Sequence, residues 1–193
     1  MKYIASLALA TAGLLAAPIA QAHTTLYSAF LSGPAEAPAN NSPGTGTVLI
    51  TLDYDLVTMR VQASFSGLLG NTTASHIHAA TVNPFASTAG VATQTPTFTG
   101  FPLGVTSGSY DQVFDMTLAA SYNTTFITNN GGTVSGAFNA LTSAMDNGKA
   151  YFNVHTSSFP GGEIRGFLTV VPEPGTASLA TLLGAGIFLR RRR

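Results

Sequence analysis

The sequence has 193 residues, with eight Lys or Arg, eight Asp or Glu and no cysteine. The lack of cysteine excludes disulfides, thiol catalysis and thiolate metal sites, so stability must come from an apolar core and the backbone hydrogen bonds. Residues 23–171 contain three basic and seven acidic side chains, which speaks against nucleic acid as a partner of this part of the chain.

Residues 1–22 have the pattern of a signal peptide. Lys2 supplies a basic start, residues 4–17 are an apolar run, and Ala20-Gln21-Ala22 is an A-x-A cleavage box. We therefore expect export, cleavage after Ala22 and a mature chain that begins at His23.

Residues 23–171 have the composition of a β domain, rich in Thr, Ser, Gly, Asn, Phe and Val. In residues 58–65 apolar and polar side chains alternate, as in a half-buried strand. Strands are predicted at residues 24–31, 46–52, 58–65, 74–78, 110–118, 150–155 and 163–170. A helix is predicted over residues 139–147, with Asn139 as its cap and Gly148 as its stop. Residues 80–108 read as long loops with one short strand.

Together these elements predict an all-β fold: one antiparallel β-sandwich, Greek-key-like, flanked by two apolar targeting segments. The predicted core includes Ile77, Phe152, Val154 and Ile164, because each alternates with polar neighbours in its strand.

Three of the four histidines lie on predicted strands. His76-Ile77-His78 places two imidazoles on one strand face, a spacing found in copper and zinc sites of β proteins. His155 has the same phase in its own strand, so the three are candidate ligands for copper(II) or zinc on solvent-side faces. The alternative is that the histidines are surface residues that bond to the backbone and loops.

The hairpin after His155 offers polar neighbours for that histidine. If its strands pair symmetrically about Phe159, His155 lies opposite Glu163, and Asn153 opposite Arg165. One interpretation is a structural network that ties the hairpin together. The other makes Glu163 an acceptor that orients the His155 ring and raises its pKa.

His23 is a further candidate ligand. Cleavage after Ala22 would let its terminal amine and its imidazole chelate one copper ion. The alternative is that its position merely reflects where the signal peptide ends.

Residues 172–193 have the pattern of a second targeting segment. Pro172-Glu173-Pro174 interrupts the chain, residues 176–189 are apolar or small, and Arg190, Arg191, Arg192 and Arg193 end the sequence. This pattern predicts a short transmembrane segment with the arginines on the cytoplasmic side.

Four ordered blocks, spread over residues 24–170, resemble the CHRD domain, the module named after chordin. They are the segments 30–38 (FLSGPAEAP), 75–78 (SHIH), 148–156 (GKAYFNVHT) and 160–166 (PGGEIRG). The tail is similar to the PEP-CTERM sorting signal. That resemblance implies processing by an exosortase-type enzyme in bacteria that make extracellular polysaccharide.

These observations favour an exported cell-surface or matrix protein without enzymatic activity, whose partners would be the exosortase, the membrane and extracellular polysaccharide. A metal-binding envelope protein is the alternative. A glycoside hydrolase using Glu36 and Glu163 is disfavoured, because no catalytic motif accompanies the two carboxyls, and no catalytic residue is assigned.

Overall fold

The computed structural model describes residues 23–172. The predicted signal peptide and most of the predicted sorting tail lie outside the described residues. The strands are β1 (Thr24–Ser32), β2 (Thr45–Asp53), β3 (Thr58–Ser66), β4 (Thr72–His78), β5 (Gly108–Asp115), β6 (Tyr151–Thr156), β7 (Ile164–Phe167) and β8 (Thr169–Val170). The helices are α1 (Thr124–Asn129) and α2 (Val134–Asp146), with two 3₁₀ turns, η1 (Gly33–Ala35) and η2 (Ala119–Ser121).

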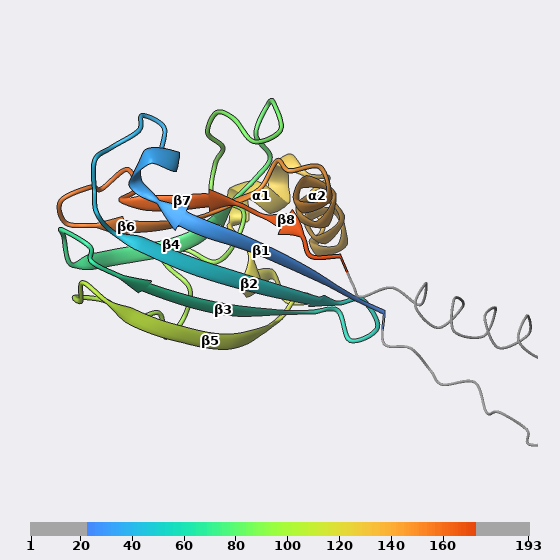
Figure 1. The fold of residues 1–193 in the computed structure, drawn as a ribbon. Helices are drawn as coiled ribbons and strands as arrows, with labels where there is room; N and C mark the ends of the chain where they lie inside the picture. Colours follow the sequence, from blue (N-terminus) through green and yellow to red (C-terminus); the bar gives the residue numbers. More distant parts are fainter. Residues whose placement is uncertain (1–22, 173–193) are drawn as a thin grey trace, which may run out of the picture.

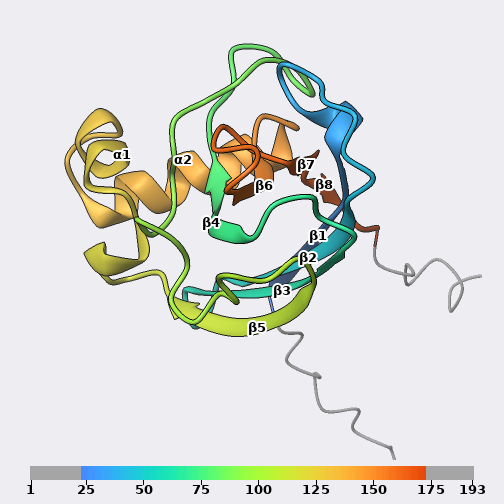
Figure 2. The ribbon, with the colours of Figure 1, turned by 90° about the vertical axis from the view of Figure 1, so that its left-hand side faces the viewer.

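The strands form one antiparallel sheet in the order β4-β6-β7-β1-β2-β3-β5, and β8 pairs with β1. The sheet curls, so that β4, β6 and β7 lie across from β1, β2, β3 and β5 (Figures 1 and 2). The predicted all-β single domain is confirmed, and its two layers are halves of one continuous sheet.

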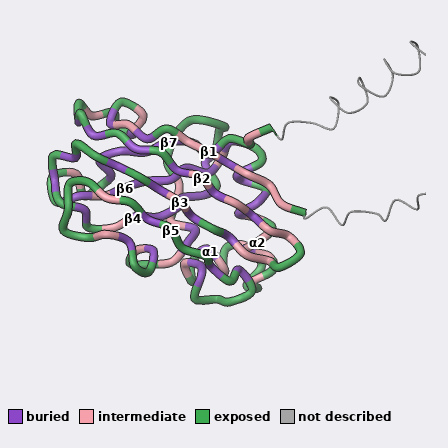
Figure 3. The backbone as a smooth tube through the Cα atoms, turned by 60° about the horizontal axis from the view of Figure 1, so that its bottom comes forward, coloured by how far each residue is buried: buried purple, intermediate pink, exposed green. Residues whose placement is uncertain are grey.

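The core lies between these two halves. Burial alternates along β3, where Met59, Val61, Ala63 and Phe65 are buried, and a similar alternation runs along β2, so that buried and more exposed stretches interchange along these strands (Figure 3). The four predicted core residues, Ile77, Phe152, Val154 and Ile164, are fully buried. Phe98 joins the two layers, because its ring lies 6.1 Å from that of Phe152 and 5.1 Å from that of Phe114.

The predicted helix begins in the wrong place. Helix α2 starts at Val134, capped by Thr133, whose hydroxyl accepts a hydrogen bond from the Gly136 amide at 3.0 Å, so Asn139 lies inside the helix. The predicted stop is nearly right, since Gly148 has φ +63° just after the helix end. Helix α1 was not predicted, because its sequence TTFITN has low helix propensity.

The ends of β5 and the course of the last predicted strand also differ from the prediction. Strand β5 ends at Asp115, where the carboxylate accepts hydrogen bonds from the amide and hydroxyl of Thr117 and turns the chain. The predicted strand 163–170 is divided into β7 and β8 around Leu168, which is fully buried.

Residues 79–107 wrap the free edge of β4. The hydroxyls of Thr93 and Thr97 accept hydrogen bonds from the amides of Ile77 and Ser75, both at 2.9 Å. In place of the short strand expected here, the segment forms isolated bridges, His78 with Val91 and Thr93 with Tyr122. The segment therefore covers β4 through threonine hydroxyls and scattered backbone hydrogen bonds, such as that from the Phe98 amide to the Ser75 carbonyl at 3.2 Å, rather than through a regular ladder. Among residues 23–172, no helix has the length and apolar character needed to cross a membrane.

Candidate metal centre

Strands β4 and β6 bring three histidines together. The two strands pair with Ile77 opposite Phe152 and His78 opposite Tyr151. Because side chains alternate, His76, His78 and His155 share the face opposite the core. One ring nitrogen from each of the three lies within 4.8 Å of the others.

This face is not solvent-exposed, so the predicted solvent-side position is wrong. His76 is 6% exposed and His78 is 8% exposed. The reason is the wrapping segment 79–107, which the sequence pattern alone did not place over the histidines.

Each imidazole is held by a backbone carbonyl on its outer side. The Pro96 oxygen lies 2.6 Å from Nε2 of His76, the Ala89 oxygen 2.9 Å from Nδ1 of His78, and the Pro160 oxygen 2.9 Å from Nδ1 of His155. A carbonyl can only accept, so these ring nitrogens carry the proton and donate it. The opposite nitrogen of each neutral ring therefore presents a lone pair.

Those opposite nitrogens are His76 Nδ1, His78 Nε2 and His155 Nε2. All three are buried and have no hydrogen-bond partner among the described residues. The rings face one another, with centroids 5.2 to 5.7 Å apart. In a tetrahedral site with metal–nitrogen bonds of about 2.0–2.1 Å, neighbouring nitrogens are about 3.3 Å apart, so a modest inward movement would let all three share an ion.

Burial lowers the pKa of all three histidines, and it lowers the pKa of His78 to about 4. The carbonyl hydrogen bonds oppose this shift, while repulsion by neighbouring histidines adds to it for His76 and His78. The rings are therefore neutral near pH 7, which is the protonation state that binds metal.

Glu163 does not orient His155. Its carboxylate accepts hydrogen bonds from the hydroxyls of Ser42 and Thr156 and from the amides of Leu69 and Gly70. Thr156 follows His155 in β6 and so points to the opposite face. The carbonyl of Pro160 takes the orienting role that was predicted for Glu163.

The predicted rise in the pKa of His155 is accordingly wrong. No carboxylate compensates its burial, so the pKa is lowered. Burial raises the pKa of Glu163 itself, but its four hydrogen bonds outweigh that effect and the net pKa is lowered.

The predicted pairing of Asn153 with Arg165 is confirmed. Arg165 donates hydrogen bonds to the carbonyls of Ala35 and Ser87, and its Nε lies 3.8 Å from the Glu36 carboxylate. The structural network thus exists: Glu163 ties the hairpin through the Thr156 hydroxyl, while the acid beside Arg165 is Glu36.

Tyr151 links this network to the cluster. The Arg165 guanidinium lies 4.7 Å over the Tyr151 ring, which stacks on His78 at 4.8 Å with 2° between the planes. Sequence reasoning missed Tyr151 and the three carbonyls. The carbonyls could not be predicted, because every residue has one. Tyr151 could have been predicted, because alternation along β6 places it on the same face as Asn153 and His155.

His23 lies apart from the cluster. Its ring packs 5.1 Å from the ring of Tyr54, and its backbone nitrogen donates to Asp55 at 3.2 Å. In the described structure it is not one of the grouped ligands.

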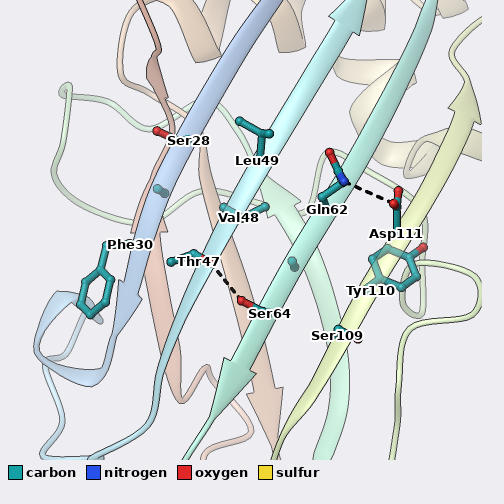
Figure 4. A pocket seen from close by; sticks show the side chains of 12 residues that line it. Ser28, Phe30, Thr47, Val48, Leu49, Gln62, Ser64, Ser109, Tyr110 and Asp111 are labelled. Atoms are coloured by element: carbon teal, nitrogen blue, oxygen red, sulfur yellow. Dashed lines mark hydrogen bonds between the residues drawn. The ribbon is translucent and has the colours of Figure 1, made fainter.

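A different surface is hollowed on the outer face of β1, β2, β3 and β5. It carries hydroxyl and amide side chains, including Thr47, Gln62 and Ser64, beside the exposed ring of Phe30 (Figure 4). Asp111 at its edge is engaged by Gln62 and by Arg60. This face offers hydrogen bonds to a polar ligand rather than metal ligands.

The fold and the cluster define the class of the protein as an all-β module: one curled antiparallel sheet with a group of three histidines on its non-core face. The CHRD domain model matches residues 27–168, and the chain belongs to the CHRD domain family. The matched range includes the three clustered histidines. No curated protein and no solved structure matches the chain.

Proposed function

We propose that this CHRD domain binds one copper or zinc ion through His76, His78 and His155. The observation that carries the proposal is the convergence of three buried imidazole nitrogens that have no partner among residues 23–172. Buried polar atoms are nearly always satisfied, and three facing lone pairs cannot satisfy one another. A cation satisfies all three at once.

The surroundings support a metal site rather than a proton-binding one. Each ring is already fixed by a carbonyl on its outer side, which is how metal-bound histidines are usually oriented. The lowered pKa values keep the rings free of competing protons.

Metal analysis and calorimetry on the purified full chain test the proposal. We expect one ion per chain, and a loss of affinity of at least about 100-fold in His78→Ala and His155→Ala. His23→Ala is the matched control, because this histidine lies outside the cluster, and it should bind like the parent. Absence of copper and zinc binding by the parent would refute the proposal.

We further propose that the protein is exported and acts at the cell envelope without catalysing a reaction. The support is the signal-peptide pattern of residues 1–22 and the PEP-CTERM-like tail of residues 172–193, which an exosortase-type enzyme would process. Detection of the protein in the envelope fraction of its bacterial host tests this, and a cytoplasmic location would refute it.

The outer face of Figure 4 is the proposed contact surface for extracellular polysaccharide. Hydroxyl and amide groups beside an exposed aromatic ring suit sugar hydroxyls and ring faces. Retardation in gels that contain soluble polysaccharide should weaken in Phe30→Ala but not in Leu56→Ala, another exposed apolar residue. Equal retardation of both variants would contradict this role.

A further inference from the structure

We infer that the histidine cluster selects the monovalent ion Cu(I) over copper(II) and zinc. The inference deepens the proposed function and rests on it, since it requires that the cluster holds a metal at all.

The ligands themselves carry no charge. An imidazole binds a metal only as the neutral ring, and the carbonyl hydrogen bonds leave one nitrogen of each ring free to bind. Among the described residues, the ligand group includes no carboxylate. Glu163, the acid nearest in the strand register, is bound on the other face. The full charge of the ion would therefore remain uncompensated by its ligands.

The neighbourhood of the cluster is positively charged. The cation next to the cluster is Arg165, which reaches it through the Tyr151 ring that stacks on His78. Glu36 offsets this charge only in part, because the closest approach of the ion pair is 3.8 Å. A second positive charge on the metal would therefore meet additional repulsion.

The binding nitrogens of the cluster are buried. The three free nitrogens are shielded from solvent, so a bound ion must give up most of its water. In a continuum description the free energy of desolvation grows with the square of the charge. Desolvating a divalent ion therefore costs about four times as much as desolvating a monovalent ion of the same size.

The cluster supplies three ligands, which is one fewer than either divalent ion prefers. Zinc takes four ligands, and copper(II) favours four in a tetragonal plane, so a water would have to complete either geometry in a covered site. Zn²⁺ and Cu(I) both have a filled d shell, so coordination number is what separates them here: three imidazoles leave zinc one ligand short, whereas they complete a three-coordinate Cu(I) site.

Competition titrations on the full chain in detergent test the inference. Cu(I), prepared anaerobically with ascorbate as the reductant, is titrated against bicinchoninate, and copper(II) and zinc are each titrated against a chromophoric chelator. We expect one Cu(I) per chain, bound at least 100-fold more tightly than either divalent ion. His155→Gln should lose this binding and His23→Ala should keep it.

The possible outcomes distinguish the presence of a metal site from its selectivity for Cu(I). Copper(II) or zinc bound as tightly as Cu(I) would overturn the selectivity and leave the metal site standing. No binding of any of the three ions would overturn both. X-ray absorption of the copper-loaded parent needs no variant to fold: three nitrogen neighbours support the inference, and four or more light-atom neighbours contradict it.

Discussion

Ser42 and Glu163 lie 121 positions apart in the sequence, and the Ser42 hydroxyl donates a hydrogen bond of 2.6 Å to the Glu163 carboxylate. The hydroxyl of Thr156 and the amides of Leu69 and Gly70 donate to the same group. One buried carboxylate thus joins the chain before β2, the turn before β4 and the β6–β7 hairpin. It is a structural anchor rather than part of the metal centre.

Glu163→Gln should lower the free energy of unfolding by about 2–4 kcal/mol, because buried donors lose a charged acceptor. Chemical denaturation measures this loss. The control is Asp111→Asn, which removes an exposed ion pair with Arg60 and should cost far less stability than Glu163→Gln. Equal losses in the two variants would contradict the anchoring role.

The three clustered histidines should destabilise the metal-free protein as the pH falls below 6.5. The pKa of each clustered histidine is lowered from its ordinary value of 6.5, so the unfolded chain takes up protons first. The stability these groups contribute is full above 6.5 and is lost as the pH falls, down to about 4 for His78.

Glu163 should extend this loss to more acidic pH. Its pKa is lowered from 4.5, so its contribution is present above 4.5 and disappears as the pH falls through the lower folded value. Denaturation with a chelator present, at pH 7.5, 5.5, 4.5 and 3.5, measures both effects. Glu36 opposes the histidine effect, because burial raises its pKa to about 7 and the folded chain takes up this proton first. The histidine assignment is therefore checked by comparison with His78→Gln, in which the loss between pH 7.5 and 5.5 should be smaller. An equal loss in parent and variant would contradict the assignment.

Gly162→Ala should disturb the turn that holds His155. Gly162 has φ +131°, and an added Cβ would lie 2.6 Å from the Asn153 amide and 2.7 Å from Glu36 Oε1. We expect a loss of stability of about 1–3 kcal/mol and weaker metal binding, because the Pro160 carbonyl is in the same turn. Gly161→Ala is the control, since its Cβ would enter open space. An unchanged affinity and stability in Gly162→Ala would refute this prediction.

The alternation of side chains along the strands explains how much of this structure could be predicted from the sequence. Period-two alternation located β1, β2, β3, β4 and β6 to within two residues and identified the core side of Ile77 and Phe152. Symmetry about Phe159 gave the correct register of Asn153 and Arg165. These features depend on local side-chain pattern, which a sequence displays directly.

Burial of the histidines and the direction of Glu163 could not be predicted in the same way. The cover over His76 and His78 is made by backbone carbonyls of a segment without periodicity. Glu163 lies just outside β7, where strand alternation no longer dictates the side-chain direction. The start of α2 was missed because Gly136 weakens the helical pattern in its first turn.

Phe98→Ala should remove about 3–5 kcal/mol of stability, because a fully buried ring leaves a cavity between the two halves of the sheet. Phe30→Ala is the control, since that ring is 63% exposed and its loss should cost little. Thermal unfolding followed by circular dichroism compares the two. Similar transition temperatures would mean that Phe98 does not join the layers.

The exported protein should begin at His23 and should lack, or be held in the membrane by, the segment after Pro172. Intact-mass measurement of the envelope and secreted fractions checks both ends. Retention of residues 1–22 would contradict the first part. A soluble exported form that still ends at Arg193 would contradict the second.

The carbonyl cover of His76 and His78 has a consequence for variation among similar chains. Every amino acid offers the same carbonyl, so Ala89 and Pro96 can be exchanged without loss of the acceptor, provided that the backbone keeps its course. The imidazoles allow no such exchange. Most side chains of segment 79–107 could therefore change in evolution while His76 and His78 stay in place. Two related chains could then look unrelated if only this segment were compared.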